Sequence, residues 1–159
     1  MVWFPYQEYF TDHIKDQQLM TTVVCNTHEM ACDSYLTDGN TIQSVRKVFR
    51  KKGHVVGIAG DYAACMEFIS WWLRGGGEEY NGAMDEVDVL ILTTKGKILH
   101  YISCSKPFEL TDPFAAIGSG SAAAMGAMHM GATPAQAVLA ASKVDVNTGG
   151  KISIRRRGK

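Results

Sequence analysis

The sequence lacks an excess of charge of either sign. Its 159 residues contain 16 Lys and Arg against 16 Asp and Glu, so the formal net charge is zero. A neutral chain supplies no electrostatic field that would hold a polyanion or an acidic lipid surface. Nucleic acid is therefore not expected as a partner. The one dense basic run, residues 155–159, is typical of a solvated tail.

Long hydrophobic runs are also missing. The apolar run over residues 87–92 is short and carries a charge at Asp88, whereas a helix needs about 20 mainly apolar residues to cross a bilayer. Residues 1–10 lack the basic start and the uniform apolar core of a secretory signal. We therefore expect no membrane association.

Cysteine is sparse, and no two of the four residues have the C-x-x-C spacing of a zinc site or a redox pair. Four free thiols are typical of a reducing cytoplasm, where we expect this protein to reside. The five His residues are scattered and form no cluster of metal ligands. The sequence thus predicts neither a bound metal nor another cofactor.

Several short β-prone runs occur in pairs separated by turn residues, and they predict hairpins. The arms of these hairpins are residues 21–26 and 29–34, residues 44–50 and 54–59, and residues 87–93 and 97–103. Two further runs, residues 114–117 and 151–155, predict additional strands.

Three segments predict helices. Over residues 61–73 the apolar period changes from two to nearly four, which indicates an amphipathic helix lying on a sheet. The Ala- and Met-rich segment that follows Ser121 predicts a second helix, which ends at about Gly131. A third is expected over residues 133–143, where Thr133 and Gln136 can form a capping box around a proline at the first helical position.

Strands that gather before and after helices, with little strict alternation, predict an α+β fold with helices packed outside antiparallel sheets. The chain length fits one domain, which we expect over residues 21–159. Residues 1–20 differ from the rest, being aromatic and charged by turns, and are expected to form an N-terminal extension.

Five local strings occur in a characteristic order along this arrangement. They are Thr21-Thr22 opening a strand, Ala31-Cys32-Asp33-Ser34 closing the next, Thr41 followed by Val45-Arg46-Lys47-Val48, Ile58-Ala59-Gly60 before a helix, and Ala116-Ile117-Gly118-Ser119-Gly120 before another. In this order they resemble the proteasome β-subunit and the bacterial HslV peptidase, which are N-terminal nucleophile (Ntn) hydrolases. The resemblance covers roughly residues 21–155 and implies a four-layer αββα sandwich.

The family places its nucleophile on the first residue of the mature chain, and the matching position is Thr21. The α-amino group of that residue can act as the base that activates its hydroxyl, because its pKa near 7.7–8.0 suits neutral pH. This base does not exist while Met20 is attached. The resemblance therefore implies a threonine endopeptidase that becomes active once the chain begins at Thr21, with residues 1–20 as a propeptide or an over-extended start. Taken alone, Thr21 and Thr22 would be ordinary strand residues.

Lys47 matches the family lysine whose charge lowers the cost of forming the alkoxide, and Asp33 matches the carboxylate that orients this lysine. On one continuous strand Val45, Lys47 and Phe49 would share a face, so Lys47 would point inward between apolar neighbours, where an ammonium needs a partner. The alternative for an isolated lysine is a solvated charge on an edge strand.

Gly60 matches the residue whose backbone N–H binds the oxyanion, at a helix start where the dipole is positive. The next family residue is commonly another glycine, whereas this chain has Asp61, which can cap the helix.

Ser119, Asp145 and Thr148 match the residues that polarise the N-terminal amine and position its proton. Without the resemblance, the Gly118-Ser119-Gly120 string could be a phosphate cradle, but it lacks the lysine of a P-loop. Small residues that permit close helix-on-sheet packing are the stronger alternative.

By matching positions, five apolar side chains would line the pocket beside the nucleophile, and Thr37 would offer its backbone to an extended peptide. These five are Leu36, Val45, Phe49, Ile58 and Tyr62. An apolar pocket predicts cleavage after hydrophobic side chains.

The resemblance implies a homo-oligomeric ring acting on peptides or unfolded proteins. An ATPase unfoldase as partner stays open, because a glycine-rich loop leads directly from Leu73 to Val87 where the family has a second outer helix. Two other functions also stay open. One is a catalytically inactive ring or scaffold member whose residues 1–20 cover the site, and the other is an amide hydrolase acting on a small molecule.

Overall fold

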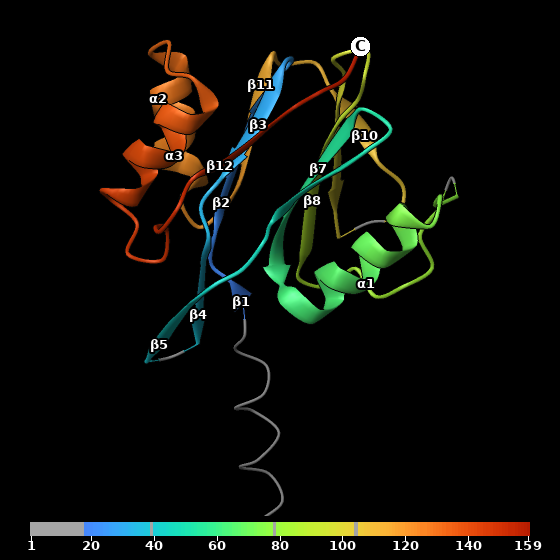
Figure 1. Ribbon diagram of the computed structural model, residues 1–159, viewed down its shortest axis with the longest axis horizontal. Helices are drawn as coiled ribbons and strands as arrows, with labels where there is room; N and C mark the ends of the chain where they lie inside the picture. The colour runs from blue at the N-terminus through green and yellow to red at the C-terminus, as the bar shows by residue number, and fades with distance from the viewer. Residues whose placement is uncertain (1–17, 39, 78, 104) are drawn as a thin grey trace, which may run out of the picture.

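The computed structural model describes residues 18–159 except residues 39, 78 and 104 (Figure 1). Residues 1–17, which make up most of the expected N-terminal extension, lie outside the described residues. The described chain forms two larger antiparallel sheets, one small hairpin sheet and three helices, an α+β architecture as the sequence predicts.

The larger sheet has the strand order β1-β7-β8-β9-β10, with β6 paired to β7 on the same edge as β1. The strands are β1 (Gln18–Leu19), β6 (Val48–Lys51), β7 (His54–Asp61), β8 (Val87–Leu92), β9 (Ile98–Ile102) and β10 (Phe108–Leu110). The buried residues of β8 alternate between two apolar clusters, as expected of a central strand covered on both faces.

The second sheet has the order β11-β2-β3-β12, and a separate hairpin is formed by β4 and β5. These strands are β11 (Phe114–Gly118), β2 (Thr22–Asn26), β3 (Glu29–Cys32), β12 (Ser153–Arg156), β4 (Tyr35–Asp38) and β5 (Thr41–Ser44).

Local sequence explains where the helices begin. In α1 (Tyr62–Leu73), the N-cap Asp61 accepts a hydrogen bond from Ala64 N–H at 2.8 Å. In α3 (Pro134–Ser142), Thr133 and Gln136 form the predicted capping box. The remaining helix, α2 (Ser121–His129), has Gly120 as its N-cap.

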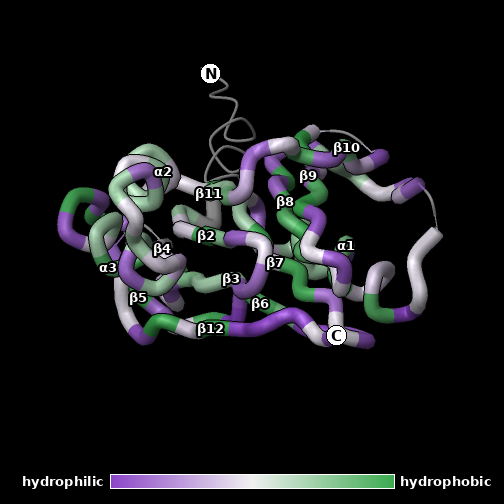
Figure 2. The backbone as a smooth tube through the Cα atoms, turned by 90° about the horizontal axis from the view of Figure 1, so that it is seen from above, coloured by the Kyte–Doolittle hydropathy of each residue, from purple (hydrophilic) through white to green (hydrophobic). Residues whose placement is uncertain are grey.

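Apolar side chains from alternate strand positions fill three layers. One cluster joins the larger sheet to α1 and includes Ile58 and Phe68. A second joins the two sheets and includes Val23 and Leu90. The third joins the second sheet to α2 and α3, and its members include Val24. Figure 2 shows the two sheets side by side, with α1 on one side and α2 and α3 on the other.

The strand expected over residues 44–50 is wrong in its first half. Ser44 ends β5, and β6 begins at Val48. Val45 N–H donates to Ser34 O at 2.9 Å, whereas the Lys47 carbonyl accepts from Ile58 N–H at 3.1 Å. The chain therefore passes from one ladder to another within residues 45–47, and this crossing interrupts the strand.

The sequence reasoning did not predict β4, β5 or β10. All four residues of β5 are exposed, as are two of the three residues of β10. Strands that bury neither face show no apolar alternation, which is the pattern that identifies a strand in a sequence. In the described part of the chain, no helix is long and apolar enough to cross a membrane.

Candidate active site

The Asp33 carboxylate is the best-connected polar group of the second sheet. Asp33 follows the end of β3 and is 1 % exposed. Its Oδ1 accepts hydrogen bonds from Thr21 Oγ1 at 2.6 Å, Thr22 N–H at 3.1 Å and Lys47 Nζ at 2.8 Å, and its Oδ2 accepts from the N–H groups of Tyr35 at 3.3 Å and Gly149 at 3.0 Å. These donors satisfy the buried carboxylate and fix its orientation.

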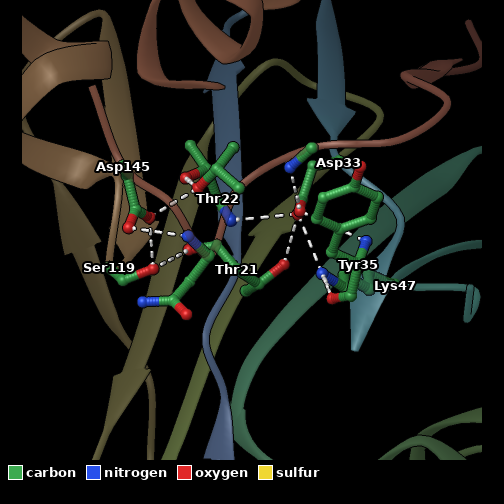
Figure 3. Close-up of polar contacts among 10 residues, drawn as sticks. Thr21, Thr22, Asp33, Tyr35, Lys47, Ser119 and Asp145 are labelled. Carbon is green, nitrogen blue, oxygen red and sulfur yellow. Dashed lines mark hydrogen bonds and ion pairs between the residues drawn. The ribbon is translucent and has the colours of Figure 1, made fainter. Parts of the chain in front are cut away.

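Thr21 lies immediately before β2 and is completely buried. Its hydroxyl donates to the same Asp33 oxygen that receives the Lys47 ammonium. Figure 3 shows the side chains of Thr21 and Lys47 converging on Asp33 from different segments of the chain. The structure thus brings together the proposed nucleophile and both residues expected to tune it.

Lys47 is 1 % exposed, and its ammonium donates to Asp33 and to the carbonyl of Tyr35. Burial lowers the pKa of Lys47, and the charge of Asp33 opposes this shift. Lys47 is buried, as the sequence predicts, but it is not a same-strand neighbour of Val45 and Phe49, because residues 45–47 belong to no strand. Lys47 is instead buried where the chain crosses between ladders.

A second polar chain runs beside Thr21. Ser119 Oγ and Thr148 Oγ1 both donate to Asp145 Oδ2, at 2.5 Å and 2.6 Å. Because the Thr148 proton is directed to this carboxylate, Thr22 Oγ1 must donate to Thr148 Oγ1, 2.7 Å away. Ser119 Oγ also lies 3.4 Å from the carbonyl oxygen of Thr21. The predicted trio of Ser119, Asp145 and Thr148 is therefore one connected group beside Thr21.

Asp145 is held as a carboxylate by its neighbours. Burial would raise its pKa, but hydrogen bonds from Ser119, Thr148 and Asn147 together lower it. The N–H of Asn147 donates to Asp145 Oδ1 at 3.1 Å. A stable negative charge at this point can attract and orient a cationic or hydrogen-bonding amine.

Gly118 and Gly120 permit the backbone to approach Thr21 and Thr22 closely. A Cβ on Gly118, whose φ is +94°, would lie 1.9 Å from the Thr21 carbonyl oxygen. A Cβ on Gly120 would lie 2.0 Å from Thr22 Oγ1. Both glycines are therefore required by packing, as one of the sequence interpretations expected.

Gly60 lies near the end of β7, two residues before α1 begins. Its φ is +115°, and a Cβ there would lie 1.8 Å from the Glu86 carbonyl oxygen. Backbone hydrogen bonds alternate in direction along a strand. Ile58 N–H points to the edge that carries β6, and Asp61 N–H points to Glu86 O on the opposite edge. The alternation therefore directs Gly60 N–H to the outer edge, where β1 lies.

The segment before Thr21 occupies this edge. Leu19 is the Cα partner of Gly60, and Gln18 is the partner of Asp61, in an antiparallel pairing. β1 also contacts β4, which contains Thr37. The protein's own chain thus pairs with β7 beside Gly60 and contacts the strand of Thr37, whose backbone the sequence predicts to bind an extended peptide.

The five residues expected to line a specificity pocket gather in one apolar cluster with α1. Phe49 and Ile58 belong to its buried core. Leu36, Val45 and Tyr62 are partly buried and pack against that core.

The sequence reasoning missed the backbone groups that complete the site. Asp33 is held by the N–H of Gly149, and Lys47 by the carbonyl of Tyr35. The Tyr35 ring covers two consecutive glycines, since Cβ atoms on Gly149 and Gly150 would lie 2.3 Å and 2.9 Å from it. The Gly-Gly pair after Thr148 was the only sequence signal for this contact. Across the described residues, no group of three or more His, Cys, Asp or Glu side chains could hold a metal ion.

Comparison with known proteins identifies the fold. No protein-family model matches the chain, and no curated protein matches it by sequence. Among solved structures, BPH from Thiobacillus denitrificans, a bacterial proteasome homologue, is similar with a TM-score of 0.66 and 18% identity over 87% of this chain and 98% of that one. The same protein in complex with epoxomicin gives a TM-score of 0.65 at 17% identity, over 87% of this chain and 99% of that one. HslV from Trypanosoma brucei gives 0.60 at 17% identity, over 86% and 97%. The chain therefore shares the fold of the BPH and HslV structures.

Proposed function

We propose that this protein is a threonine-type endopeptidase of the proteasome/HslV type, in which Thr21 becomes the nucleophile once it is the first residue of the chain. One observation carries the proposal: Thr21 Oγ1 and Lys47 Nζ meet on one buried carboxylate oxygen, at 2.6 Å and 2.8 Å from Asp33 Oδ1. Burial of an ammonium lowers stability unless the group is paired, and perturbed buried charges are common at functional sites. Here the buried ammonium of Lys47 lies beside the hydroxyl of Thr21, the proposed nucleophile.

The chemistry follows from the groups around Thr21. With Met20 removed, the α-amine takes the proton of Thr21 Oγ1, directly or through a water, and the oxygen attacks the peptide carbonyl. The new C–O bond forms an ester, the peptide C–N bond breaks, and the proton passes to the leaving amine. Water then hydrolyses the ester and regenerates the hydroxyl. The positive charge of Lys47, held by Asp33, favours the developing alkoxide.

Ser119, Asp145 and Thr148 would support the amine that acts as the base. Ser119 Oγ lies 3.4 Å from the Thr21 carbonyl and 2.5 Å from Asp145 Oδ2. A group that connects the nucleophilic residue to a permanent carboxylate can orient the freed amine and stabilise its protonated form. In the uncut chain the Thr21 nitrogen is an amide and cannot serve as this base.

The N–H of Gly60 would bind the oxyanion. It points to the edge of β7 that β1 occupies, so departure of residues 18–20 would free this donor for a substrate carbonyl. Losing one such donor typically costs about 2.7–4 kcal/mol of transition-state stabilisation. A substrate strand would then lie between β4, with Thr37, and β7, and its apolar side chain would contact the cluster of Val45, Phe49 and Ile58.

Further parts of the proposal rest on the fold alone. They are the four-layer αββα arrangement of the Ntn type, assembly into a homo-oligomeric ring, peptides or unfolded proteins as substrates, and a cytoplasmic location. We do not propose an ATPase partner.

The test compares chains that begin at Thr21, produced by cleavage of an N-terminal leader, with the full chain. Epoxomicin, the compound in the Thiobacillus denitrificans structure, serves as the probe, and intact mass reports its attachment. We expect the shortened chain to be labelled and to cleave peptides with Leu or Tyr before the cut. Thr21→Ala should lose both properties, whereas Thr22→Ser, which keeps the neighbouring hydroxyl, should retain them. Labelling that persists in Thr21→Ala would refute the proposal.

A catalytically inactive scaffold is the second candidate, because in the uncut chain β1 pairs with the edge of β7 beside Gly60 and Thr21 is completely buried. An N-terminus that stays at Met1 during prolonged incubation of the native protein, together with no labelling of the shortened chain, would favour the scaffold. Labelling without turnover of any peptide would instead favour an amide hydrolase of small molecules.

A further inference from the structure

A cavity of about 300 Å³ opens on the side of Gly60 that faces away from β1. Its walls come from the end of β7, from β8 and β9, and from Gly118 at the end of β11. Gly118 touches Thr21, because a Cβ there would lie 1.9 Å from the Thr21 carbonyl oxygen. The cavity therefore reaches Gly118, a neighbour of the proposed nucleophile, although none of its lining residues has a role in the proposed reaction other than Gly60.

Two acidic residues line this cavity. They are Glu86 and Asp88, and the lining contains no Lys or Arg. Asp88 Oδ1 lies 2.5 Å from His100 Nε2, and among the described residues no group donates to its second oxygen. The Asp88 side chain is 27 % exposed, so this second oxygen can receive a donor from a ligand.

The rest of the wall is apolar and small. Of the lining residues, Ile102, the Cα partner of Asp88 on β9, is 47 % exposed. Outside the cavity, Phe108 on β10 is 45 % exposed. The Phe108 ring lies 5.3 Å from the His100 ring. An exposed aliphatic and aromatic strip beside a carboxylate suits a side chain with a long apolar stem and a cationic end.

The cavity and β1 lie on opposite sides of Gly60. β1 pairs with the outer edge of β7, whereas Glu86, Val87 and Asp88 lie on the β8 edge. A peptide that follows the course of β1 up to Gly60 and continues past Thr21 would leave the outer edge and meet Gly118 and the cavity. The residues that follow the cut bond would therefore reach this space.

We propose that this cavity is the subsite for the residue that follows the scissile bond, and that Asp88 makes it selective for Lys or Arg. The proposal rests on the peptidase function proposed above and adds to it a preference on the leaving side of the cut. The aliphatic stem of the lysine or arginine packs on Ile102, and its cationic end pairs with Asp88 Oδ2. A glutamate in the same position meets two acidic residues and no Lys or Arg.

The test uses the chain that begins at Thr21 and three peptides that share a Leu before the cut and carry Lys, norleucine or Glu after it. Cleavage at the intended bond is measured as kcat/KM by chromatography and mass spectrometry. We expect Lys to exceed norleucine by roughly fivefold to tenfold, as for a hydrogen bond to a charged group, and Glu to be the poorest substrate.

Asp88→Asn keeps an acceptor for His100 and removes the charge of Asp88, so it should reduce the Lys-to-Glu ratio severalfold, although Glu86 still lines the cavity. Glu109→Gln is the matched control, because Glu109 is an exposed carboxylate on neighbouring β10 that pairs with Lys97 outside the cavity. That control should leave the ratio unchanged. Ile102→Lys places a positive charge at a half-exposed position of the cavity wall and leaves Asp88 unchanged. This variant should therefore shift the preference from Lys toward Glu.

The outcomes separate the two proposals. If no peptide is cleaved by the chain that begins at Thr21, the peptidase function and its subsite are both overturned. If all three peptides are cleaved at similar rates, or if Asp88→Asn and Ile102→Lys leave the ratio unchanged in folded protein, the peptidase function stands and the subsite is overturned.

Discussion

The buried pair of Lys47 and Asp33 gives the sharpest prediction for stability. Both side chains are 0 % exposed, and their charged atoms lie 2.8 Å apart. Lys47→Met replaces the ammonium with an apolar group of similar length. The change leaves the Asp33 carboxylate buried with four donors, from Thr21, Thr22, Tyr35 and Gly149.

Removal of one partner of a buried ion pair typically costs about 3–5 kcal/mol, because the other charge stays buried without compensation. The four neutral donors still stabilise Asp33, so we expect Lys47→Met to lower the free energy of unfolding by about 3 kcal/mol, at the lower end of that range. For a chain of this size the loss corresponds to a decrease in Tm of roughly 6–12 °C.

Asp33→Asn should be at least as costly, because it leaves the Lys47 ammonium buried with only the Tyr35 carbonyl and a neutral amide. The double variant Asp33→Asn/Lys47→Met contains neither charge. Its loss should therefore be smaller than the sum of the two single losses by about 1–3 kcal/mol, the coupling found for residues in direct contact.

Urea unfolding of the full chain, followed by circular dichroism, measures all four free energies. The full chain is used because its Thr21 amine is blocked, so catalysis cannot alter the sample. The reasoning would be refuted if Lys47→Met changed the free energy of unfolding by less than about 0.5 kcal/mol, as for a surface residue. Additive losses in the double variant would equally contradict a direct ion pair.

Three more predictions address other parts of the fold. Gly60→Ala should destabilise the protein by at least about 1–3 kcal/mol in urea unfolding, because φ is +115° and the new Cβ would meet the Glu86 carbonyl. In the folded protein the pKa of Asp145 is lowered below 3.8, so the contribution of Asp145 to the free energy of unfolding is complete above that pH and is lost as the pH falls through the folded pKa. Asp145→Asn should therefore make the free energy of unfolding fall less steeply on acidification. An unchanged slope would contradict the lowered pKa. Burial raises the pKa of the thiols of Cys25, Cys32 and Cys65 to about 12. Iodoacetamide at neutral pH should therefore label these three cysteines only after unfolding, which peptide mapping would detect.

Local sequence determined most of the secondary structure. The polar turn at Thr27 and His28 lies between β2 and β3, and the capping box of Thr133 and Gln136 begins α3. The apolar stripe after Asp61 is α1. Each of these signals acts within a few residues, so it can be recognised without knowledge of the fold. The exposed strands β5 and β10 gave no such signal, since neither buries an apolar face.

The candidate site was predicted as a set of residues through a resemblance, but its geometry could not be derived from strand periodicity. On a continued strand Asp33 would be paired with Thr22 and face the helices with it, because the register pairs Val23 with Cys32. The chain instead leaves the strand after Cys32, and the Asp33 carboxylate turns to meet Thr21 as well as Thr22 N–H.

The sequence by itself determined the three hairpins of the two larger sheets, the three helices, the N-caps of α1 and α3, and the identities of the polar residues at the ends of strands. Only the tertiary structure decided that Thr21 and Lys47 meet on one oxygen of Asp33, that β1 pairs with β7 beside Gly60, and that Asp88 and Gly118 line one cavity. The physical reason is distance along the chain. Turns and caps are closed by neighbouring residues, whereas the burial of Lys47 depends on a crossing between two ladders that forms only when both sheets pack together.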